Sequence, residues 1–148
     1  MILPVTANLK EIEKQGRNYP WIRPEVCLRC KGCRLWGHGF VGAFFDGCAE
    51  VLMLRRYRCP ACGCVMKLKP RGYLRRFQAT TETIRFHIER RLETGRWPMG
   101  CSCPRCRHWL RSLKRQTLAH LDIRWLMQLP QAFDRLMEMG CIPVSRAI

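Results

Sequence analysis

The sequence has 148 residues, enough for one compact domain or two very small ones. It carries 27 Lys and Arg against 11 Asp and Glu, and the net charge of +16 indicates a polyanionic partner, with nucleic acid ahead of a membrane surface. No apolar run approaches about 18 residues, so we expect no membrane-spanning helix and no membrane role.

The 11 cysteines are too many for chance and need an explanation. The N-terminal stretch Met1–Val5 is too short for a signal peptide, so we expect a reducing cytoplasm rather than an oxidising compartment. In that setting cysteines are metal-bound or free rather than paired in disulfides.

Residues 1–26 are predicted to be a short lead-in. Asn8 is suited to cap a helix of about two turns that ends near Gly16, with Glu11 as an acidic partner in the first turn. Pro20 and Pro24 then favour an extended approach to the cysteines that follow.

Two C-x-x-C pairs dominate the chain: Cys27 with Cys30, and Cys59 with Cys62. Paired thiols on two tight turns are typical of a structural zinc site, here the centre of a zinc ribbon over residues 27–66. We therefore predict one Zn²⁺ with four thiolate ligands and no open position for chemistry. The alternative is four buried or disulfide-linked cysteines, which this spacing disfavours.

A β-hairpin is predicted between the two pairs. Residues 35–45 and 49–57 are rich in aromatic and branched side chains, and Asp46-Gly47 between them is typical of a type I′ turn. Gly37, Gly39 and Gly42 weaken the first strand and indicate a bulge or a close backbone approach. Cys33 or Cys64 could replace a neighbouring cysteine as ligand, and His38 is an alternative ligand on the same grounds. We interpret the extra thiols of Cys33, Cys48 and Cys64 as bystanders and His38 as a surface residue of the ribbon.

Residues 67–78 form a basic connector without acidic residues. One interpretation is a solvated linker, and the other is an arm that contacts phosphates through Arg71, Arg75 and Arg76. The sequence leaves both open.

Residues 79–148 are predicted to be helical. Thr80 or Thr81 can cap a first helix with an apolar stripe of Ile84, Ile88 and Leu92, and Gly95 ends it. A second helix is expected from about Pro104, a residue suited to a first turn. Its apolar face comprises Cys106, Leu110, Leu113 and Thr117, with Trp109 on the edge of that face.

Two helices joined by a tight turn, the second with a basic free face, predict a helix-turn-helix over about residues 80–117. The alternative is a basic amphipathic helix that only adds solubility. On the free face, the residues expected to contact bases are His108, Arg111, Ser112 and Arg115. The flanking residues expected to contact phosphates are Arg105, Arg107 and Lys114.

The stretch from Leu118 to Met139 is apolar and predicted to be helical, broken near Pro130 and ended by Gly140. We expect it to complete the helical core rather than form a dimer face.

A second group of thiols, Cys101, Cys103 and Cys106, is ambiguous. With His108 or His120 it would supply a second zinc site. We instead expect Cys106 to be a small buried residue and the other two to lie in the turn.

The segments C-L-R-C at Cys27, R-L-W-G-H-G-F at Arg34 and L-R-R-Y-R-C-P-A-C at Leu54 resemble the zinc-ribbon heads of bacterial insertion-sequence transposases. The segments T-G-R-W-P at Thr94 and R-H-W-L-R at Arg107 resemble the helix-turn-helix of small mobile-element proteins. Those transposases continue into a catalytic domain with three acidic metal ligands, and no such group is visible here. The resemblance implies DNA binding without the family's chemistry.

The fold expected is therefore α+β, a small β-rich zinc ribbon followed by a helical part. The function expected is non-enzymatic, sequence-specific binding of double-stranded DNA in the nucleoid, with a transposase or another mobile-element protein as a partner. The alternatives are a structured-RNA binder, favoured if Phe40, Phe44, Phe45 and Tyr57 form an aromatic platform, and an enzyme using cysteine chemistry. No Cys–His–acid set supports the enzyme.

Overall fold

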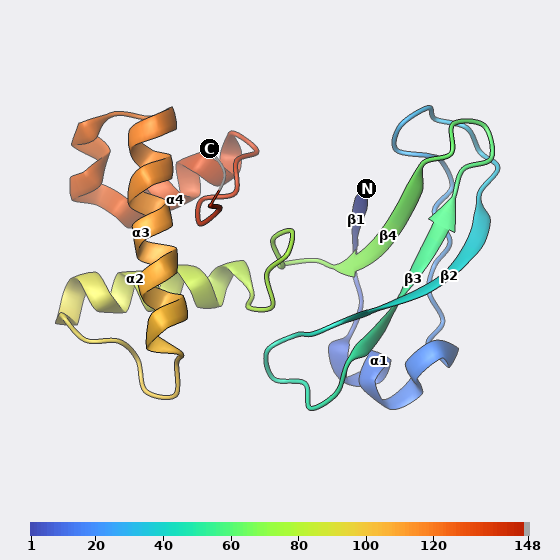
Figure 1. Ribbon diagram of the computed structural model, residues 1–148, viewed down its shortest axis with the longest axis horizontal. Coiled ribbons are helices and arrows are strands. Elements are labelled where there is room, and N and C mark those ends of the chain that lie inside the picture. The colour runs from blue at the N-terminus through green and yellow to red at the C-terminus, as the bar shows by residue number, and fades with distance from the viewer. Residues whose placement is uncertain (147–148) are drawn as a thin grey trace. The chain divides into compact units, whose positions relative to one another are not determined.

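The computed structural model describes residues 1–146, which divide into two compact units between Ala79 and Thr80. The first unit contains a sheet and one short helix, and the second contains only helices (Figure 1). The prediction of an α+β fold, with strands ahead of helices, is confirmed.

The sheet of the first unit has four strands in the order β1-β4-β3-β2. β2 (Trp36–Ala43) and β3 (Leu52–Arg58) form the predicted antiparallel hairpin, and a register shift between Gly37 and Phe40 is the expected bulge. β4 (Val65–Pro70) pairs antiparallel with β3, and β1 (Ile2–Val5) pairs parallel with β4.

The expected boundaries of this unit are wrong at both ends. Residues 1–26 are not a lead-in, because β1 extends the sheet and helix α1 (Leu9–Gln15) packs on it through Ile12. Residues 67–78 are not a free connector, because they begin with most of β4 and bury the side chain of Lys69. β1 is an edge strand, the position where a proline such as Pro4 costs no sheet hydrogen bond.

Helix α1 confirms the predicted local signals. The Asn8 side chain accepts a hydrogen bond from the Lys10 amide at 3.0 Å, and Gly16 ends the helix with a φ of 56°. A short 3₁₀ turn, η1 (Gly16–Asn18), follows. Ile12 lies in an apolar cluster with Phe45, Leu52 and Leu54.

The hairpin connection differs from the predicted type I′ turn. Its tip spans residues 44–51, and the Cys48 amide donates to the Phe45 carbonyl at 3.2 Å around Asp46-Gly47. Gly47 has a φ of 83° while Asp46 does not have a positive φ, whereas type I′ requires positive φ at both positions. Lys10 on α1 donates to the Gly47 carbonyl at 2.8 Å, so the helix holds this longer loop.

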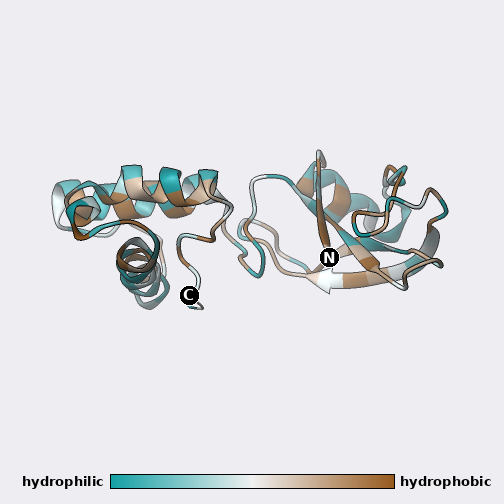
Figure 2. Cartoon of the chain, turned by 90° about the horizontal axis from the view of Figure 1, so that it is seen from above, coloured by the Kyte–Doolittle hydropathy of each residue, from teal (hydrophilic) through white to brown (hydrophobic). Residues whose placement is uncertain are grey.

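The second unit consists of α2 (Thr81–Thr94), α3 (Cys103–His120), a 3₁₀ segment η2 (Ile123–Gln128) and α4 (Leu129–Glu138). Thr80 caps α2 by accepting from the Thr83 amide at 3.0 Å, and Gly95 ends it with a φ of 69°. Pro130 lies in the first turn of α4, so the predicted break falls just before it. Along these helices hydrophobic and hydrophilic residues alternate, as expected for helices packed on one side (Figure 2).

The buried side of α3 differs from the predicted apolar stripe. Cys106, Leu113 and Thr117 are buried as expected, but Trp109 and Ser112 are buried too, while Leu110 is only half-buried. The buried face is therefore turned toward Trp109 and Ser112. α4 and η2 contact α3, and the side chain of the buried Gln116 donates to the Ser145 carbonyl at 3.2 Å. Helix periodicity alone does not specify these contacts. On α2, Ile84 and Ile88 are buried but Leu92, in the last turn, is exposed.

Candidate metal centre and nucleic-acid interface

The two C-x-x-C turns have the same backbone conformation. In the first, the Lys31 amide donates to the Cys27 carbonyl at 2.9 Å, and in the second the Gly63 amide donates to the Cys59 carbonyl at 2.9 Å. Lys31 and Gly63, each directly after the second cysteine of its pair, have φ values of 63° and 69°. Each turn thereby presents two thiols on one side.

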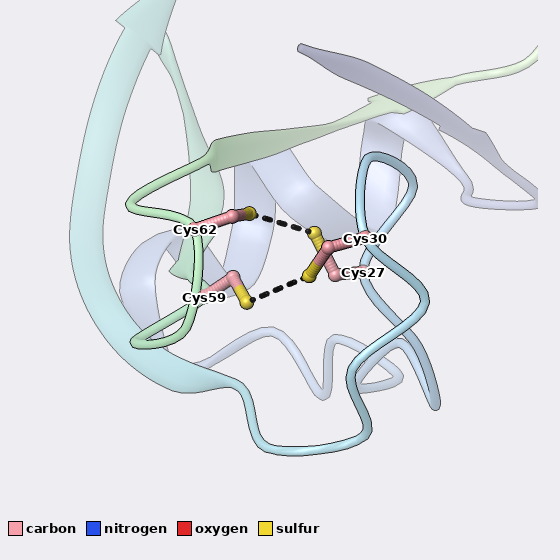
Figure 3. Close-up of side chains that lie close together, drawn as sticks. All are labelled: Cys27, Cys30, Cys59 and Cys62. Carbon is pink, nitrogen blue, oxygen red and sulfur yellow. Dashed lines mark hydrogen bonds between the residues drawn. The ribbon is translucent and has the colours of Figure 1, made fainter.

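The two turns face each other, and all four thiols point inward (Figure 3). The Cys27 and Cys62 sulfurs are 3.6 Å apart, the Cys30 and Cys59 sulfurs are 3.5 Å apart, and all four lie within 4.8 Å of one another. A disulfide bond is about 2.05 Å long, so these distances exclude covalent pairing. A tetrahedral zinc ion with Zn–S bonds of about 2.3 Å separates its sulfurs by about 3.8 Å, which these thiols approach.

Backbone amides favour the thiolate form at this centre. Hydrogen bonds from the backbone amide of Cys30 and, to a smaller extent, of Arg29 lower the pKa of the Cys27 thiol to about 6. Burial acts in the opposite direction. At Cys30 the Gly32 amide acts in the same sense, but the neighbouring thiols of Cys62 and Cys59 outweigh it and raise the pKa of Cys30 to about 12. The Cys27 thiol therefore ionises readily, whereas the raised pKa of the Cys30 thiol keeps it protonated, an arrangement in which a bound cation replaces that proton.

The predicted bystanders lie outside the four-thiol group. Among the described residues, the cluster around this centre comprises Cys27, Cys30, Cys59 and Cys62 alone. Cys33 is exposed, Cys64 is buried in the sheet core, and Cys48 and His38 are half-buried elsewhere. The structure thus brings together the four residues that the C-x-x-C spacing predicted, and the group has the geometry to hold a metal ion.

The residues predicted to contact bases are separated by the structure. Arg111 is exposed, but Ser112 is only 2 % exposed, so its prediction as a free-face residue is wrong. Arg115 is exposed, and its guanidinium donates to the carbonyls of Ser145 and Arg146 at 3.3 and 2.6 Å, which holds it against the segment after α4. His108 is half-buried and 3.4 Å from the Ser112 hydroxyl.

Burial and then the charges of Arg146, Arg115 and Arg111 lower the pKa of His108. Its imidazole is therefore neutral near pH 7 and is a poor phosphate ligand.

The exposed Arg and Lys residues of α3 are Arg107, Arg111, Lys114 and Arg115, and the first three face one pocket. These three line a shallow pocket of about 270 Å³ together with Leu110 of α3 and with Arg91 and Trp97 from the end of α2 and the loop after it. Arg91 stacks over the Trp97 ring at 5.5 Å. We call this surface the α2–α3 basic pocket. Arg105, predicted beside these residues, instead lies over the Trp109 ring at 5.0 Å and is half-buried.

A second basic surface belongs to the sheet unit. Arg75 and Arg76, both exposed, line a groove of about 890 Å³ with Lys67 and the exposed Phe44. Arg71 is exposed but lies outside that groove, beside another hollow near Trp21. Of the three arginines predicted to contact phosphates here, two therefore share one groove.

The connection between α2 and α3 is longer than expected. It covers residues 95–102, whereas the turn of a helix-turn-helix has about three to four residues. The two successive helices are as predicted, and the tight turn between them is not formed.

The second thiol group is also rearranged. Cys106 is buried and Cys101 lies in the loop, as expected, but Cys103 is the first residue of α3 rather than part of the turn. Cys101 and Cys106 lie together with His87 of α2, and Cys103 is exposed and outside the group. His108 and His120 are not members. Sequence reasoning missed His87 because no local spacing connects a residue in the middle of α2 to the start of α3.

No family model, curated protein or solved structure matches this chain. In the part of the chain that the structure describes, none of the helices combines the length and apolar character needed to cross a membrane.

Proposed function

We propose that this chain is a zinc-stabilised, sequence-specific DNA-binding protein without enzymatic activity of its own. The observation that carries the proposal is the α2–α3 basic pocket: Arg107, Arg111 and Lys114 are exposed along one side of a helix that contains no Asp or Glu. Uncompensated arginines on a helix face are the side chains that bond phosphate oxygens and guanine edges.

The four-thiol centre supports a structural role for the metal. Four protein thiolates fill a tetrahedral zinc ion and leave no position for water or substrate. Zinc bound there would join the two C-x-x-C turns and hold β3 and β4 in place. Its contribution is to the fold of the sheet unit, and the basic groove with Arg75 and Arg76 depends on that fold.

Duplex DNA fits the surface better than structured RNA does. The aromatic residues that favoured RNA do not form a common platform: Phe45 and Tyr57 are buried, and Arg55 covers Phe40 at 4.7 Å. Trp36 and Phe44 are exposed but stand at opposite ends of β2, about 26 Å apart at roughly 3.3 Å per residue. Two such distant rings do not stack neighbouring bases.

The resemblance of the cysteine turns to insertion-sequence transposases supports a mobile element as the biological setting. We propose that the chain recognises element ends or regulates an element in the nucleoid, with a transposase or a related protein as its partner.

The test is selection of bound sequences from a random duplex pool, with structured RNA as competitor, followed by affinity measurements on variants. Arg111→Ala is expected to weaken the selected site by about 1–3 kcal/mol more than a scrambled duplex, because Arg111 is the residue of the predicted base-contacting set that is exposed in the α2–α3 basic pocket, whereas Arg115 bonds backbone carbonyls. Lys114→Ala is expected to weaken both duplexes equally and to reduce the salt dependence of binding.

Arg124→Ala is the matched control, since Arg124 is exposed on η2 and already paired with Asp122 at 3.0 Å. It removes the same charge and is expected to leave both affinities unchanged. Absence of duplex binding at low salt, or displacement of the duplex by the RNA competitor, would overturn the proposal.

A further inference from the structure

Three residues of the helical unit converge from separate elements. His87 lies in the middle of α2, Cys101 in the loop 95–102, and Cys106 in the first turns of α3. Their ligand atoms all lie within 4.8 Å of one another, and the His87 Nδ1 is 3.4 Å from the Cys106 sulfur. Cys106 is fully buried, and His87 and Cys101 are half-buried.

We infer that His87, Cys101 and Cys106 form a second zinc site, independent of the four-thiol centre and of the proposed DNA binding. One imidazole nitrogen and two thiolates are a donor set that binds Zn²⁺ in preference to Mg²⁺ or Ca²⁺. With Zn–N bonds of about 2.0 Å and Zn–S bonds of about 2.3 Å, a tetrahedral ion separates nitrogen and sulfur by about 3.5 Å. The 3.4 Å between His87 and Cys106 approaches that spacing.

A simple hydrogen bond between His87 and Cys106 explains less of the arrangement. Such a bond needs only those two residues, and it gives no reason for the Cys101 thiol to lie within the same 4.8 Å. Cys101 belongs to the loop 95–102, in which Trp97 is half-buried but Met99, two residues before Cys101, is fully exposed. A metal ion bound by all three residues would close this loop onto both helices.

The second site lies beside the α2–α3 basic pocket, so an ion bound there would affect that pocket. His87 is one helical turn before Arg91, and Cys106 directly precedes Arg107, and both arginines line the α2–α3 basic pocket. The ion would therefore fix the two helices that carry the pocket. Three protein ligands leave one tetrahedral position, which solvent fills in this arrangement because Cys103 lies outside the group.

The experiment is zinc analysis of the full chain purified under reducing conditions without chelators. His87→Asn and Cys101→Ser are each expected to lose one equivalent of zinc relative to the natural chain. Neither substitution creates a large cavity, and helix content by circular dichroism verifies that the variants fold. Cys141→Ser is the matched control, since Cys141 is a half-buried thiol of the same unit outside the group, and it is expected to retain all the zinc.

Cys30→Ser distinguishes zinc lost from the four-thiol centre from zinc lost from the second site. Cys30→Ser is expected to remove the zinc of the four-thiol centre alone, and the double variant Cys30→Ser with His87→Asn is expected to lose two equivalents of zinc. Zinc content equal to the natural chain in both His87→Asn and Cys101→Ser would overturn the second site. Retention by His87→Asn together with loss by Cys103→Ser would also overturn it, because the ligands would then be the three neighbouring cysteines instead.

Discussion

Cys30 and Cys33 offer a sharp test of the four-thiol centre. Both thiols are exposed, both lie in the same turn region, and both become hydroxyls on substitution by serine. They differ in that Cys30 lies 3.5 Å from the Cys59 sulfur within the metal-binding group, whereas Cys33 lies outside it. Cys30→Ser is therefore expected to unfold the sheet unit, and Cys33→Ser to leave it intact.

The free energy of unfolding that Cys30→Ser should remove follows from the size of the sheet unit. Residues 1–79 at about 0.05–0.15 kcal/mol per residue give a free energy of unfolding of roughly 4–12 kcal/mol. Structural zinc contributes about 10–16 kcal/mol of binding free energy, which is as large as that total. Losing one thiolate ligand should therefore remove at least about 4 kcal/mol, and a chelator should reproduce the effect in the natural chain.

The assay is thermal unfolding followed by circular dichroism, with and without chelator, together with zinc content. Cys30→Ser should lose one equivalent of zinc and the unfolding transition of the sheet unit, and Cys33→Ser should match the natural chain. Identical zinc content and identical unfolding curves for the two variants would refute the argument that these thiols hold a structural ion.

Two further predictions concern stability. Ile88→Ala should lower the free energy of unfolding by about 2–5 kcal/mol, because Ile88 is 1 % exposed, whereas Leu92→Ala, at 44 % exposed, should cost well under half as much in the same denaturant titration. Burial, and then the charge of Lys67, lowers the pKa of Lys69 from 10.5 to about 8. Between pH 8 and 10.5 the unfolded chain therefore binds more protons at this residue than the folded chain does. The free energy of unfolding should rise with pH over that range, by at most about 3 kcal/mol. Lys69→Met should abolish this rise while Lys67→Met retains most of it, and parallel pH profiles of the natural chain and Lys69→Met would contradict the assignment.

Local chemistry explains why the sequence predicted the four-thiol group so closely. A C-x-x-C turn is specified within a few residues, and its geometry repeats at Cys27 and Cys59 whatever surrounds it. The same holds for the caps at Asn8 and Thr80 and for the helix end at Gly95, each confirmed by a hydrogen bond or a positive φ within one turn.

Contacts between distant segments were decided by the tertiary structure. β1 joins the sheet beside a strand more than 60 residues later, and a four-residue segment with a proline carries too weak a pattern to predict that pairing. Ser112 is buried because α3 is rotated by what packs on it, which a 3.6-residue period cannot specify for a helix with polar residues on both sides. Cys101 and Cys106 acquire His87 as a neighbour only because α2 and α3 pack together. Sequence spacing determined what lies within a single turn of this protein. Packing between segments far apart in the chain determined which of those turns meet. The free energy of these long-range contacts comes from burial shared by two segments, and those segments carry no common local pattern.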